Sequence, residues 1–394
     1  MKQIQIIPSK SDAHRALICA ALSETPCQVI CNATSKDIEA TKACLGAFQA
    51  GQRQMHCGES GSTFRFLLPV MAALGYSCEF LPEGRLPERP LSPLYEEMEN
   101  HGCKLSPQGT VPFVLEGQLQ PGDYHIPGNV SSQYISGLLF ALPMLDGDSR
   151  ILIEGKLESV GYVDMTLKVL ADFGIVVRIT EEGYEIPGGQ SYEGPPVYQV
   201  EGDWSNGCFW LVAGALSEEG IKVCGLDLNS LQGDKAIIDL LKQMGADVTI
   251  DQEGILIKGG HLHGIEIDAS QIPDMVPILA VAALAAEGTT EIKNAGRLRI
   301  KESDRLATVS TVLNGLGGQI KELEEGLIIT GGRALSGGEV DSYNDHRIAM
   351  MAAIASLLCE DKVVIEGADA VNKSYPDFFQ VLEEVGLDGN VERK

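Results

Sequence analysis

Apolar and polar positions along the chain follow one pattern six times. Each copy opens with small or polar residues and continues as a strongly apolar helical stretch. It then breaks at a short polar turn and resumes as a β-branched strand that ends near Gly or Asn. The six copies begin at Ser9, Gly61, Ser131, Asp203, Pro273 and Asp345. The pattern therefore predicts an α/β protein built from internal repeats.

A second unit recurs between these copies: an amphipathic helix, a closing glycine and another strand. The glycines lie where a helix end favours a residue without Cβ, at Gly102, Gly174, Gly245 and Gly317. Each repeat is thus predicted to run β-α-β-α-β-β. The first helix of a repeat, such as 274–286, is apolar nearly all round and should be buried. Six repeats divide most simply into two lobes of three, and a cleft between lobes is the expected binding site.

Charge narrows the possible partners of the chain. It carries 30 basic and 55 acidic residues, a net charge of -25 that would repel nucleic acid and anionic membranes. A site for small anions would therefore need a local cluster of Lys and Arg. The 10 cysteines form no C-x-x-C pair or zinc spacing, and no apolar run reaches about 18 residues, so we expect a reduced, soluble, cytoplasmic protein. The pair His261 and His263 has a spacing that a metal could use, or it marks a polar strand end or turn.

The repeat starts carry the candidate chemistry. Basic and hydroxyl residues gather there in the segments 9–15, 61–65, 131–133 and 345–347, and Asp274 lies at a fifth start. Helix N-termini expose N–H groups that suit phosphate or carboxylate. Alternatively, the Ser, Thr and Asp residues are ordinary N-caps. That alternative leaves unexplained why Lys10, Arg15 and Arg347 stand in otherwise apolar helices, where an unpaired base is costly.

A further basic group lies at 297–305. Lys301 and Arg305 are predicted one turn apart on one helix face, with Glu302 adjacent. The buried stripe of that helix would be Leu306, Val309, Leu313 and Leu316. Taken alone, this group could equally be a solvated ion-pair surface.

Six motifs together resemble one known family. They are S-K-S-D-A-H-R-A-L at 9–17, V-S-S-Q-Y at 130–134, I-P-D at 272–274, R-I-K-E-S-D-R-L-A at 299–307, Y-N-D-H-R-I-A-M at 343–350 and K-S-Y-P-D-F at 373–378. In order and spacing they are similar to the 5-enolpyruvylshikimate-3-phosphate synthases, over essentially the whole chain.

The resemblance implies a two-lobed enolpyruvyl transferase fold, each lobe holding three β-α-β-α-β-β repeats around buried parallel helices. The N-terminal lobe would span 9–202 and bind shikimate 3-phosphate. The C-terminal lobe would span 203–394, include residues 1–8 and bind phosphoenolpyruvate. The implied reaction moves a carboxyvinyl group from phosphoenolpyruvate to the 5-hydroxyl of shikimate 3-phosphate. A cytoplasmic monomer without metal or organic cofactor is expected, with glyphosate competing at the donor site.

The resemblance also implies a role for individual residues. Shikimate 3-phosphate would be bound by Lys10, Ser11, Arg15, Ser131, Ser132, Gln133, Ser159, Tyr162, Asp274, Arg297 and Lys301. Phosphoenolpyruvate would be bound by Lys10, Gly61, Arg89, Gln133, Arg305, Arg347 and Lys373, with Arg305 and Arg347 forking its carboxylate. Proton transfer and phosphate departure would involve Asp274, Glu302, Lys10 and Lys373.

The chain departs from the family pattern at three places. A common Gly between Pro8 and Ser9 is missing, Glu59 replaces a common Asn, and Arg297 stands where some members have Asn.

Two other functions are alternatives to that of the synthase. A related transferase acting on UDP-N-acetylglucosamine has a reactive Cys in the loop that corresponds to 83–90, which has none here. A non-catalytic anion-binding descendant would be expected to lose Asp274, Glu302 or Lys373, and all three are present.

Overall fold

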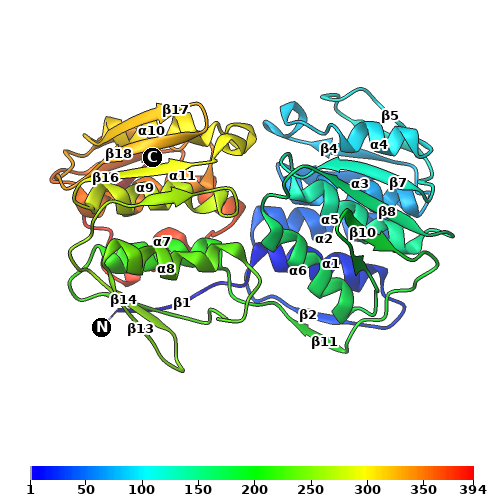
Figure 1. Cartoon of the computed structure of the whole chain (residues 1–394), viewed down its shortest axis with the longest axis horizontal. Coiled ribbons are helices and arrows are strands. Elements are labelled where there is room, and N and C mark those ends of the chain that lie inside the picture. The colour runs from blue at the N-terminus through cyan, green and yellow to red at the C-terminus, as the bar shows by residue number, and fades with distance from the viewer. Residues whose placement is uncertain (1) are drawn as a thin grey trace. The chain divides into compact units, whose positions relative to one another are not determined.

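The computed structural model describes residues 2–394, which form two compact units. One unit comprises residues 2–9 and 201–394, and the other is Lys10–Val200 (Figure 1). The chain therefore passes from one unit to the other twice, after Ser9 and after Val200. These positions lie within two residues of the boundaries expected at 9 and 202. Each unit has its own hydrophobic core.

The Lys10–Val200 unit alternates helices and short strands. Its helices are α1 (Lys10–Leu22), α2 (Lys36–Gln49), α3 (Gly61–Ala73), α4 (Leu94–Asn100), α5 (Ser132–Ala141) and α6 (Val160–Asp172), with short 3₁₀ turns η1 (Leu86–Glu88) and η2 (Leu142–Met144). Its strands are β2 (Gln28–Ile30), β3 (Gln54–Gly58), β4 (Cys78–Pro82), β5 (Cys103–Leu105), β6 (Phe113–Gly117), β7 (Asp123–Pro127), β8 (Ser149–Glu154), β9 (Arg178–Ile179), β10 (Gly183–Ile186) and β11 (Val197–Gln199).

The other unit repeats this arrangement. Its helices are α7 (Trp204–Ala215), α8 (Ile237–Met244), α9 (Val276–Ala285), α10 (Arg305–Gly315), α11 (His346–Ala355) and α12 (Phe378–Glu384), with 3₁₀ turns η3 (Gly233–Ala236), η4 (Pro273–Met275), η5 (Gly296–Ile300), η6 (Ser356–Leu358) and η7 (Ala368–Lys373). Its strands are β1 (Lys2–Gln5), β12 (Ile221–Cys224), β13 (Asp247–Ile250), β14 (Ile255–Lys258), β15 (Glu266–Asp268), β16 (Thr289–Lys293), β17 (Gln319–Leu323), β18 (Gly326–Thr330), β19 (Gly338–Asp341), β20 (Val363–Glu366) and β21 (Val391–Arg393).

Four of the six repeats form the complete β-α-β-α-β-β unit. Their sheets have the orders β3-β4-β6-β5, β7-β8-β10-β9, β1-β12-β14-β13 and β15-β16-β18-β17. In each, the first two strands are parallel and the last two form an antiparallel hairpin. The expectation of six complete repeats is wrong for the other two, which form the sheets β11-β2 and β19-β20-β21. The next strand after α2 is β3, which opens the following repeat, and the strand that follows α12 is β21, which pairs with β20.

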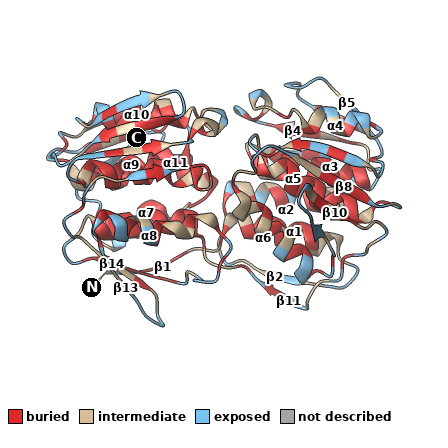
Figure 2. Cartoon of the chain, viewed as in Figure 1, coloured by how far each residue is buried: buried red, intermediate tan, exposed pale blue. Residues whose placement is uncertain are grey.

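The first helix of each repeat is the buried one, as its apolar sequence predicts. α7 and α11 are buried along their whole length, α3, α5 and α9 along nearly all of it, and α1 along most of its first half. Figure 2 shows these helices as the buried centre of each unit, with exposed residues on the outer strands and loops. The closing glycines also behave as predicted, since all four have positive φ: Gly102 at 97°, Gly174 at 78°, Gly245 at 103° and Gly317 at 96°.

Close packing of α3 on α5 depends on Gly137. An added Cβ there would lie 2.4 Å from the backbone oxygen of Arg65 and 2.9 Å from Cγ of Pro69. We expect Gly137→Ala to lower the free energy of unfolding by about 1–3 kcal/mol, because the two helices would have to separate. Gly46 in α2 is a matched control, since its added Cβ would meet nothing within 4 Å.

The control should change stability in the opposite direction. Gly46→Ala should raise the free energy of unfolding by about 0.5–1 kcal/mol through the better helix propensity of alanine. Urea denaturation followed by circular dichroism measures both variants. Equal midpoints for the two proteins would contradict close α3–α5 packing at Gly137.

Candidate functional site

Arg15 is the centre of one group of expected site residues in the Lys10–Val200 unit. Its guanidinium is buried and donates to Thr166 Oγ1 at 2.8 Å, to the Ser11 carbonyl at 2.5 Å and to the Tyr162 carbonyl at 2.8 Å. Its Cζ lies 5.2 Å from the ring centre of Phe66 and 6.0 Å from that of Tyr162. Burial lowers the pKa of Arg15 to about 10, so it stays charged at neutral pH. The structure thus brings Ser11, Arg15 and Tyr162 together.

A second group gathers at the start of α3. An added Cβ on Gly61 would lie 3.0 Å from Nη1 of Arg65 and 3.1 Å from Nη1 of Arg89, so both guanidiniums converge on this helix N-terminus. Arg65 donates to Gln133 Oε1 at 2.8 Å, and Gln133 Nε2 donates to Ser62 Oγ at 2.9 Å. Two cations beside the unpaired N–H groups of a helix start form a site suited to a phosphate.

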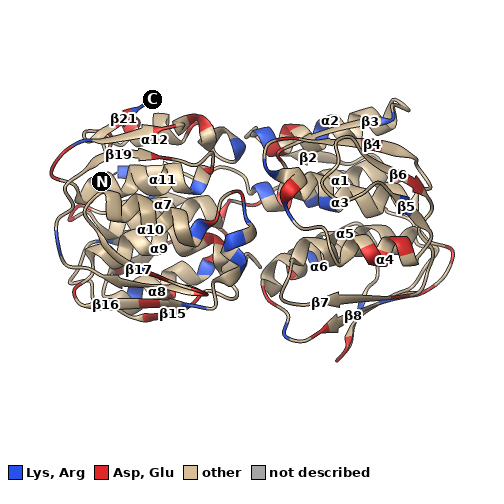
Figure 3. Cartoon of the chain, turned by 90° about the horizontal axis from the view of Figure 1, so that it is seen from above, with Lys and Arg blue, Asp and Glu red and all other residues tan. Residues whose placement is uncertain are grey.

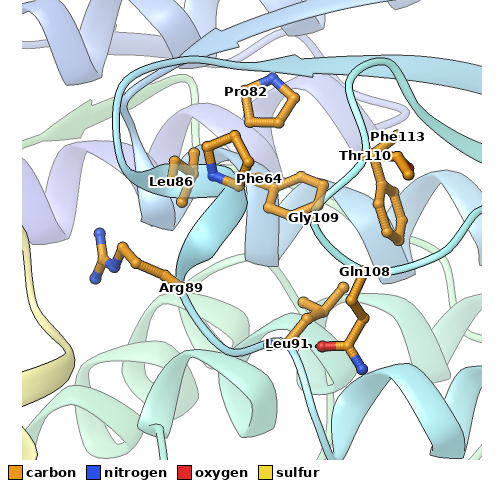
Figure 4. A pocket seen from close by; sticks show the side chains of 10 residues that line it. Phe64, Pro82, Leu86, Arg89, Leu91, Gln108, Gly109, Thr110 and Phe113 are labelled. Carbon is orange, nitrogen blue, oxygen red and sulfur yellow. Dashed lines mark hydrogen bonds between the residues drawn. The ribbon is translucent and has the colours of Figure 1, made fainter.

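Arg89 also lines a small hollow. Its wall is mostly apolar and includes Phe64, Leu86, Leu91 and Phe113. The hollow contains about 260 Å³ of space and is partly open to solvent. Figure 4 shows the guanidinium of Arg89 directed away from these rings. The hollow therefore packs the stem of Arg89, while its guanidinium lies against Gly61 at the start of α3.

Lys10 has a partner that the sequence did not reveal. Its Nζ lies 2.8 Å from Oδ2 of Asp37, in the first turn of α2, and both side chains are largely buried. The pair holds Lys10 in one position while keeping its charge balanced.

The three serines expected at the acceptor phosphate lie at helix starts. Ser131 caps α5, where its Oγ accepts from the backbone N–H of Gln133 at 3.3 Å, and Ser132 is the first helical residue. The N-cap interpretation thus holds for Ser131. Ser159 precedes α6, is buried and has a left-handed backbone with φ of 53°. Such a conformation costs a non-glycine residue of order 1–3 kcal/mol and is concentrated at functional sites.

The other unit carries a dense charge cluster around Arg305. This guanidinium is 1% exposed and donates to Asp345 at 2.8 and 3.1 Å, to Asp274 Oδ1 at 2.8 Å and to Glu302 Oε2 at 2.7 Å. These bonds use four of its five N–H groups, so one remains on Nη1 for a further acceptor. Burial would lower the pKa of Arg305, but Asp345, Glu302 and Asp274 raise it above its usual value.

Asp274 is the point where three cations meet. Besides Arg305, its carboxylate lies 3.4 Å from Lys301 Nζ and 3.4 Å from Arg347 Nη2. Burial would raise the pKa of Asp274, yet Arg347, Lys301 and Arg305 hold it well below its usual value. Asp274 is therefore ionised at neutral pH and is the one carboxylate of this cluster that contacts Lys301, Arg305 and Arg347 together.

The predicted placement of Lys301 and Arg305 on one helix is wrong. Asp304 caps α10 by accepting from the Ala307 N–H at 3.2 Å, so the helix begins at Arg305, and Lys301 directly follows the η5 turn. Both side chains nevertheless reach Asp274. Burial lowers the pKa of Lys301, Asp274 opposes this shift, and the charges of Arg305 and Arg297 lower it further.

Lys373 is oriented by the loop that precedes α11. It is buried at the end of η7, and its Nζ donates to the Asn344 carbonyl at 2.5 Å. Tyr343 and Asn344 both have φ of 52°, a left-handed backbone that turns the chain directly before Asp345. In Figure 3 several Lys and Arg segments gather at one end of the helices, and others lie on outer strands and loops. The overall acidic chain thus has local basic clusters where anions are expected to bind.

Sequence reasoning missed four functional candidates. Arg65 lies in the segment 61–65 but was assigned no role from the sequence, although its position four residues after Gly61 places it on the same helix face. Asp37, Thr166 and the carboxylate of Asp345 had no such signal, because their partners come from distant segments.

Among residues 2–394, no group of three His, Cys, Asp or Glu side chains could hold a metal, so His261 and His263 form no such site. Within the same residues, no helix is long and apolar enough to cross a membrane.

Comparisons with known proteins point to one family. A family profile described as EPSP synthase (3-phosphoshikimate 1-carboxyvinyltransferase) matches residues 36–382. The 3-phosphoshikimate 1-carboxyvinyltransferase of Clostridium acetobutylicum is 47% identical over 98% of this chain and 95% of its own length, and that of Clostridium novyi is 44% identical with the same coverage. The structure of EPSP synthase from Acinetobacter baumannii has a TM-score of 0.81 at 26% identity, covering 98% of this chain and 95% of that chain. The enolpyruvyl transferase NikO from Streptomyces tendae shares the fold, with a TM-score of 0.77 at 19% identity over 98% of this chain and 95% of that chain.

Proposed function

Because the chain belongs to the EPSP synthase family, the 3-phosphoshikimate 1-carboxyvinyltransferases, we propose how its own residues perform that reaction. The enzyme transfers the carboxyvinyl group of phosphoenolpyruvate to the 5-hydroxyl of shikimate 3-phosphate. The products are 5-enolpyruvylshikimate 3-phosphate and phosphate, in the shikimate pathway to aromatic amino acids.

Four changes must be made at the reacting atoms. A proton is added to the methylene carbon of the donor, and the 5-hydroxyl oxygen bonds to the neighbouring carbon while losing its own proton. The bond from that carbon to the phosphate oxygen then breaks, and loss of a proton from the new methyl group restores the vinyl group. The reaction thus needs a base, an acid and cations at the leaving phosphate.

The observation that carries the proposal is the ionised Asp274 among Lys301, Arg305 and Arg347. Asp274 would orient the 5-hydroxyl or accept its proton, and Glu302 is held 2.7 Å from Arg305 for proton exchange at the methylene carbon. The donor carboxylate would bind Arg347 and the one N–H group of Arg305 that does not donate to Asp345, Asp274 or Glu302.

Phosphate groups would bind in the Lys10–Val200 unit at helix starts. We assign the donor phosphate to the start of α3, with Arg89, Lys10 and Gln133, and we keep Lys373 as an expected ligand. Arg65 joins this set because its guanidinium also lies against Gly61. The acceptor would be held by Ser11, Arg15 and Tyr162 at its carboxylate and ring. Its 3-phosphate would bind Ser131, Ser132, Ser159 and Lys301, with Arg297 and Lys10 nearby.

Phosphate release tests the acceptor. Phosphoenolpyruvate should release phosphate with shikimate 3-phosphate and not with UDP-N-acetylglucosamine. Release with the UDP-sugar alone would identify the related transferase, and release with neither would support a non-catalytic descendant.

Arg347→Lys tests the donor carboxylate. Lysine keeps the charge but loses the planar pair of N–H groups, so the KM for phosphoenolpyruvate should rise about five- to tenfold. The KM for shikimate 3-phosphate should stay within about twofold in the same steady-state assays. Equal increases in both constants would remove Arg347 from the donor site.

We further propose a cytoplasmic monomer that glyphosate inhibits at the donor site. All ten cysteines are free thiols, and eight are buried, which fits a reducing compartment. Sedimentation equilibrium tests the monomer, and a dimer mass at micromolar protein would contradict it.

A further inference from the structure

A continuous chain of hydrogen bonds connects the first parts of α1, α2 and α3. His14 Nδ1 lies 2.7 Å from Thr41 Oγ1, Thr41 Oγ1 lies 2.6 Å from Thr63 Oγ1, and Thr63 Oγ1 lies 2.7 Å from Ser60 Oγ. The first three residues are 0% exposed and Ser60 is 1% exposed. We call these four residues the His14–Ser60 chain. Such a fully buried network holds its members rigidly, because water cannot replace a lost bond.

The direction of donation in this chain is fixed by proton count. The single hydroxyl proton of Thr63 is directed to Ser60 Oγ at 2.7 Å, with the Asp37 carbonyl as a longer alternative at 3.4 Å. With that proton used, Thr41 donates to Thr63 and His14 donates from Nδ1 to Thr41. Burial lowers the pKa of His14 well below its usual value, and Lys10 and Arg15 lower it further, so the ring is neutral. In this tautomer Nε2 carries no proton, which agrees with its buried position without a hydrogen-bond partner.

The His14–Ser60 chain ends at the proposed donor-phosphate site. Ser60 caps α3 by accepting from the Thr63 N–H at 3.3 Å, and Gly61 is the next residue. Thr63 Oγ1 also lies 3.4 Å from the carbonyl oxygen of Asp37, whose carboxylate holds Lys10. Removing the Thr41 hydroxyl would leave Thr63 without its donor and loosen the cap that orients the first N–H groups of α3.

Thr166 lies in an equivalent but separate network. Its Oγ1 accepts from Arg15 Nε at 2.8 Å, donates to the Tyr162 carbonyl at 3.0 Å and lies 2.8 Å from the hydroxyl of Ser136. Thr166 is also 0% exposed. This network ends at Arg15, on the proposed acceptor side, and contains no member of the His14–Ser60 chain.

We propose that Thr41 and Thr166 are positioning residues that act on different substrates. Thr41 acts through Thr63 and Ser60 on phosphoenolpyruvate, and Thr166 acts through Arg15 on shikimate 3-phosphate. The proposal rests on the proposed function, which assigns the start of α3 to the donor and Arg15 to the acceptor. Neither threonine is expected to touch a substrate.

Two matched substitutions test the proposal. Thr41→Val and Thr166→Val remove the same hydroxyl from equally buried sites of one unit. Thr41→Val should raise the KM for phosphoenolpyruvate about three- to tenfold and leave the KM for shikimate 3-phosphate within about twofold. Thr166→Val should do the reverse. Thr41→Ser and Thr166→Ser keep the hydroxyl and should restore most of each loss.

A merely structural role predicts a different result. Both valine variants would then lower the melting temperature and change the two Michaelis constants alike, which would overturn the proposal. Arg15→Lys and Gly61→Ala alter residues that are proposed to contact the substrates directly. They distinguish a failure of the positioning proposal from a failure of the proposed function. If these two direct variants fail to split the constants, the substrate assignment itself is wrong. If they split the constants and the threonine variants do not, only the positioning roles are wrong.

The direction of donation from His14 can be tested on the wild-type enzyme. Nitrogen-15 NMR of the histidine-labelled wild-type enzyme should show His14 as the neutral Nδ1–H tautomer, assigned by its absence from His14→Asn. A His14 protonated at Nε2 alone would overturn the His14–Ser60 chain, even if Thr41→Val failed to fold.

Discussion

Asp274→Asn is expected to lower turnover by roughly 100-fold or more, the scale of general acid–base help. Asparagine keeps the volume of the side chain but cannot take up the proton of the 5-hydroxyl. The three surrounding cations remain, so neither substrate should bind less tightly. Steady-state kinetics with both substrates should therefore show a large loss in kcat and Michaelis constants that are unchanged or lower.

Asp304→Asn is the matched control for this prediction. Asp304 is also an acidic residue paired with an arginine, at 2.9 Å from Arg299 Nη1, but it caps α10 and faces no expected substrate group. Asparagine caps a helix about as well as aspartate, so kcat should stay within about threefold of the wild type. If Asp274→Asn behaves like this control, Asp274 is neither the base nor the group that orients the hydroxyl.

Local signals in the sequence predicted most of the fold. The buried first helices and the positive φ of Gly102 and Gly245 follow from apolar pattern and backbone sterics, which act within a few residues. The two incomplete repeats were not predicted, because strands β11 and β2 pair from opposite ends of their unit. Such long-range pairing leaves no periodic trace in either segment.

The sequence pointed to residues of the candidate site but not to the hydrogen bonds and ion pairs between them. The family resemblance pointed to Lys10, Asp274 and Arg305, and the presence of Lys10, Arg15 and Arg347 in apolar helices marked those bases as unusual. Their partners could not be found in this way, since Asp37 reaches Lys10 and Asp345 reaches Arg305 only after folding. The helix expected to include Lys301 begins later because the capping side chain of Asp304 competes with continued helix.

Glu59 shows how a departure from the family pattern is accommodated. A Cβ added to Gly84 would lie 2.7 Å from Cδ of Glu59, so this carboxyl group lies against the turn at Gly84. Gly84 has φ of 55° and leaves the space that the carboxyl group occupies. The added negative charge is therefore packed on the neighbouring turn, and the arginines at Gly61 keep their convergent arrangement.

Gly61→Ala is expected to weaken glyphosate inhibition by about 10- to 100-fold while raising the KM for phosphoenolpyruvate only about two- to fivefold. The new methyl group would lie 3.0 Å from Arg65 Nη1 and 3.1 Å from Arg89 Nη1, so both guanidiniums must shift. Overpacking of this kind costs about 1–3 kcal/mol when the ligand fills the space. Glyphosate should fill more of the donor pocket than phosphoenolpyruvate does, so it should bear most of that cost.

Inhibition constants measured against varied phosphoenolpyruvate decide this prediction. The wild type should show competitive inhibition, which places glyphosate and the donor in one pocket. Gly46→Ala adds the same methyl group to α2 in open space and should leave both constants unchanged. Equal glyphosate sensitivity in Gly61→Ala and the wild type would mean that Gly61 does not line the shared pocket. The two arginines would then bind the donor phosphate without the close approach that a missing side chain allows.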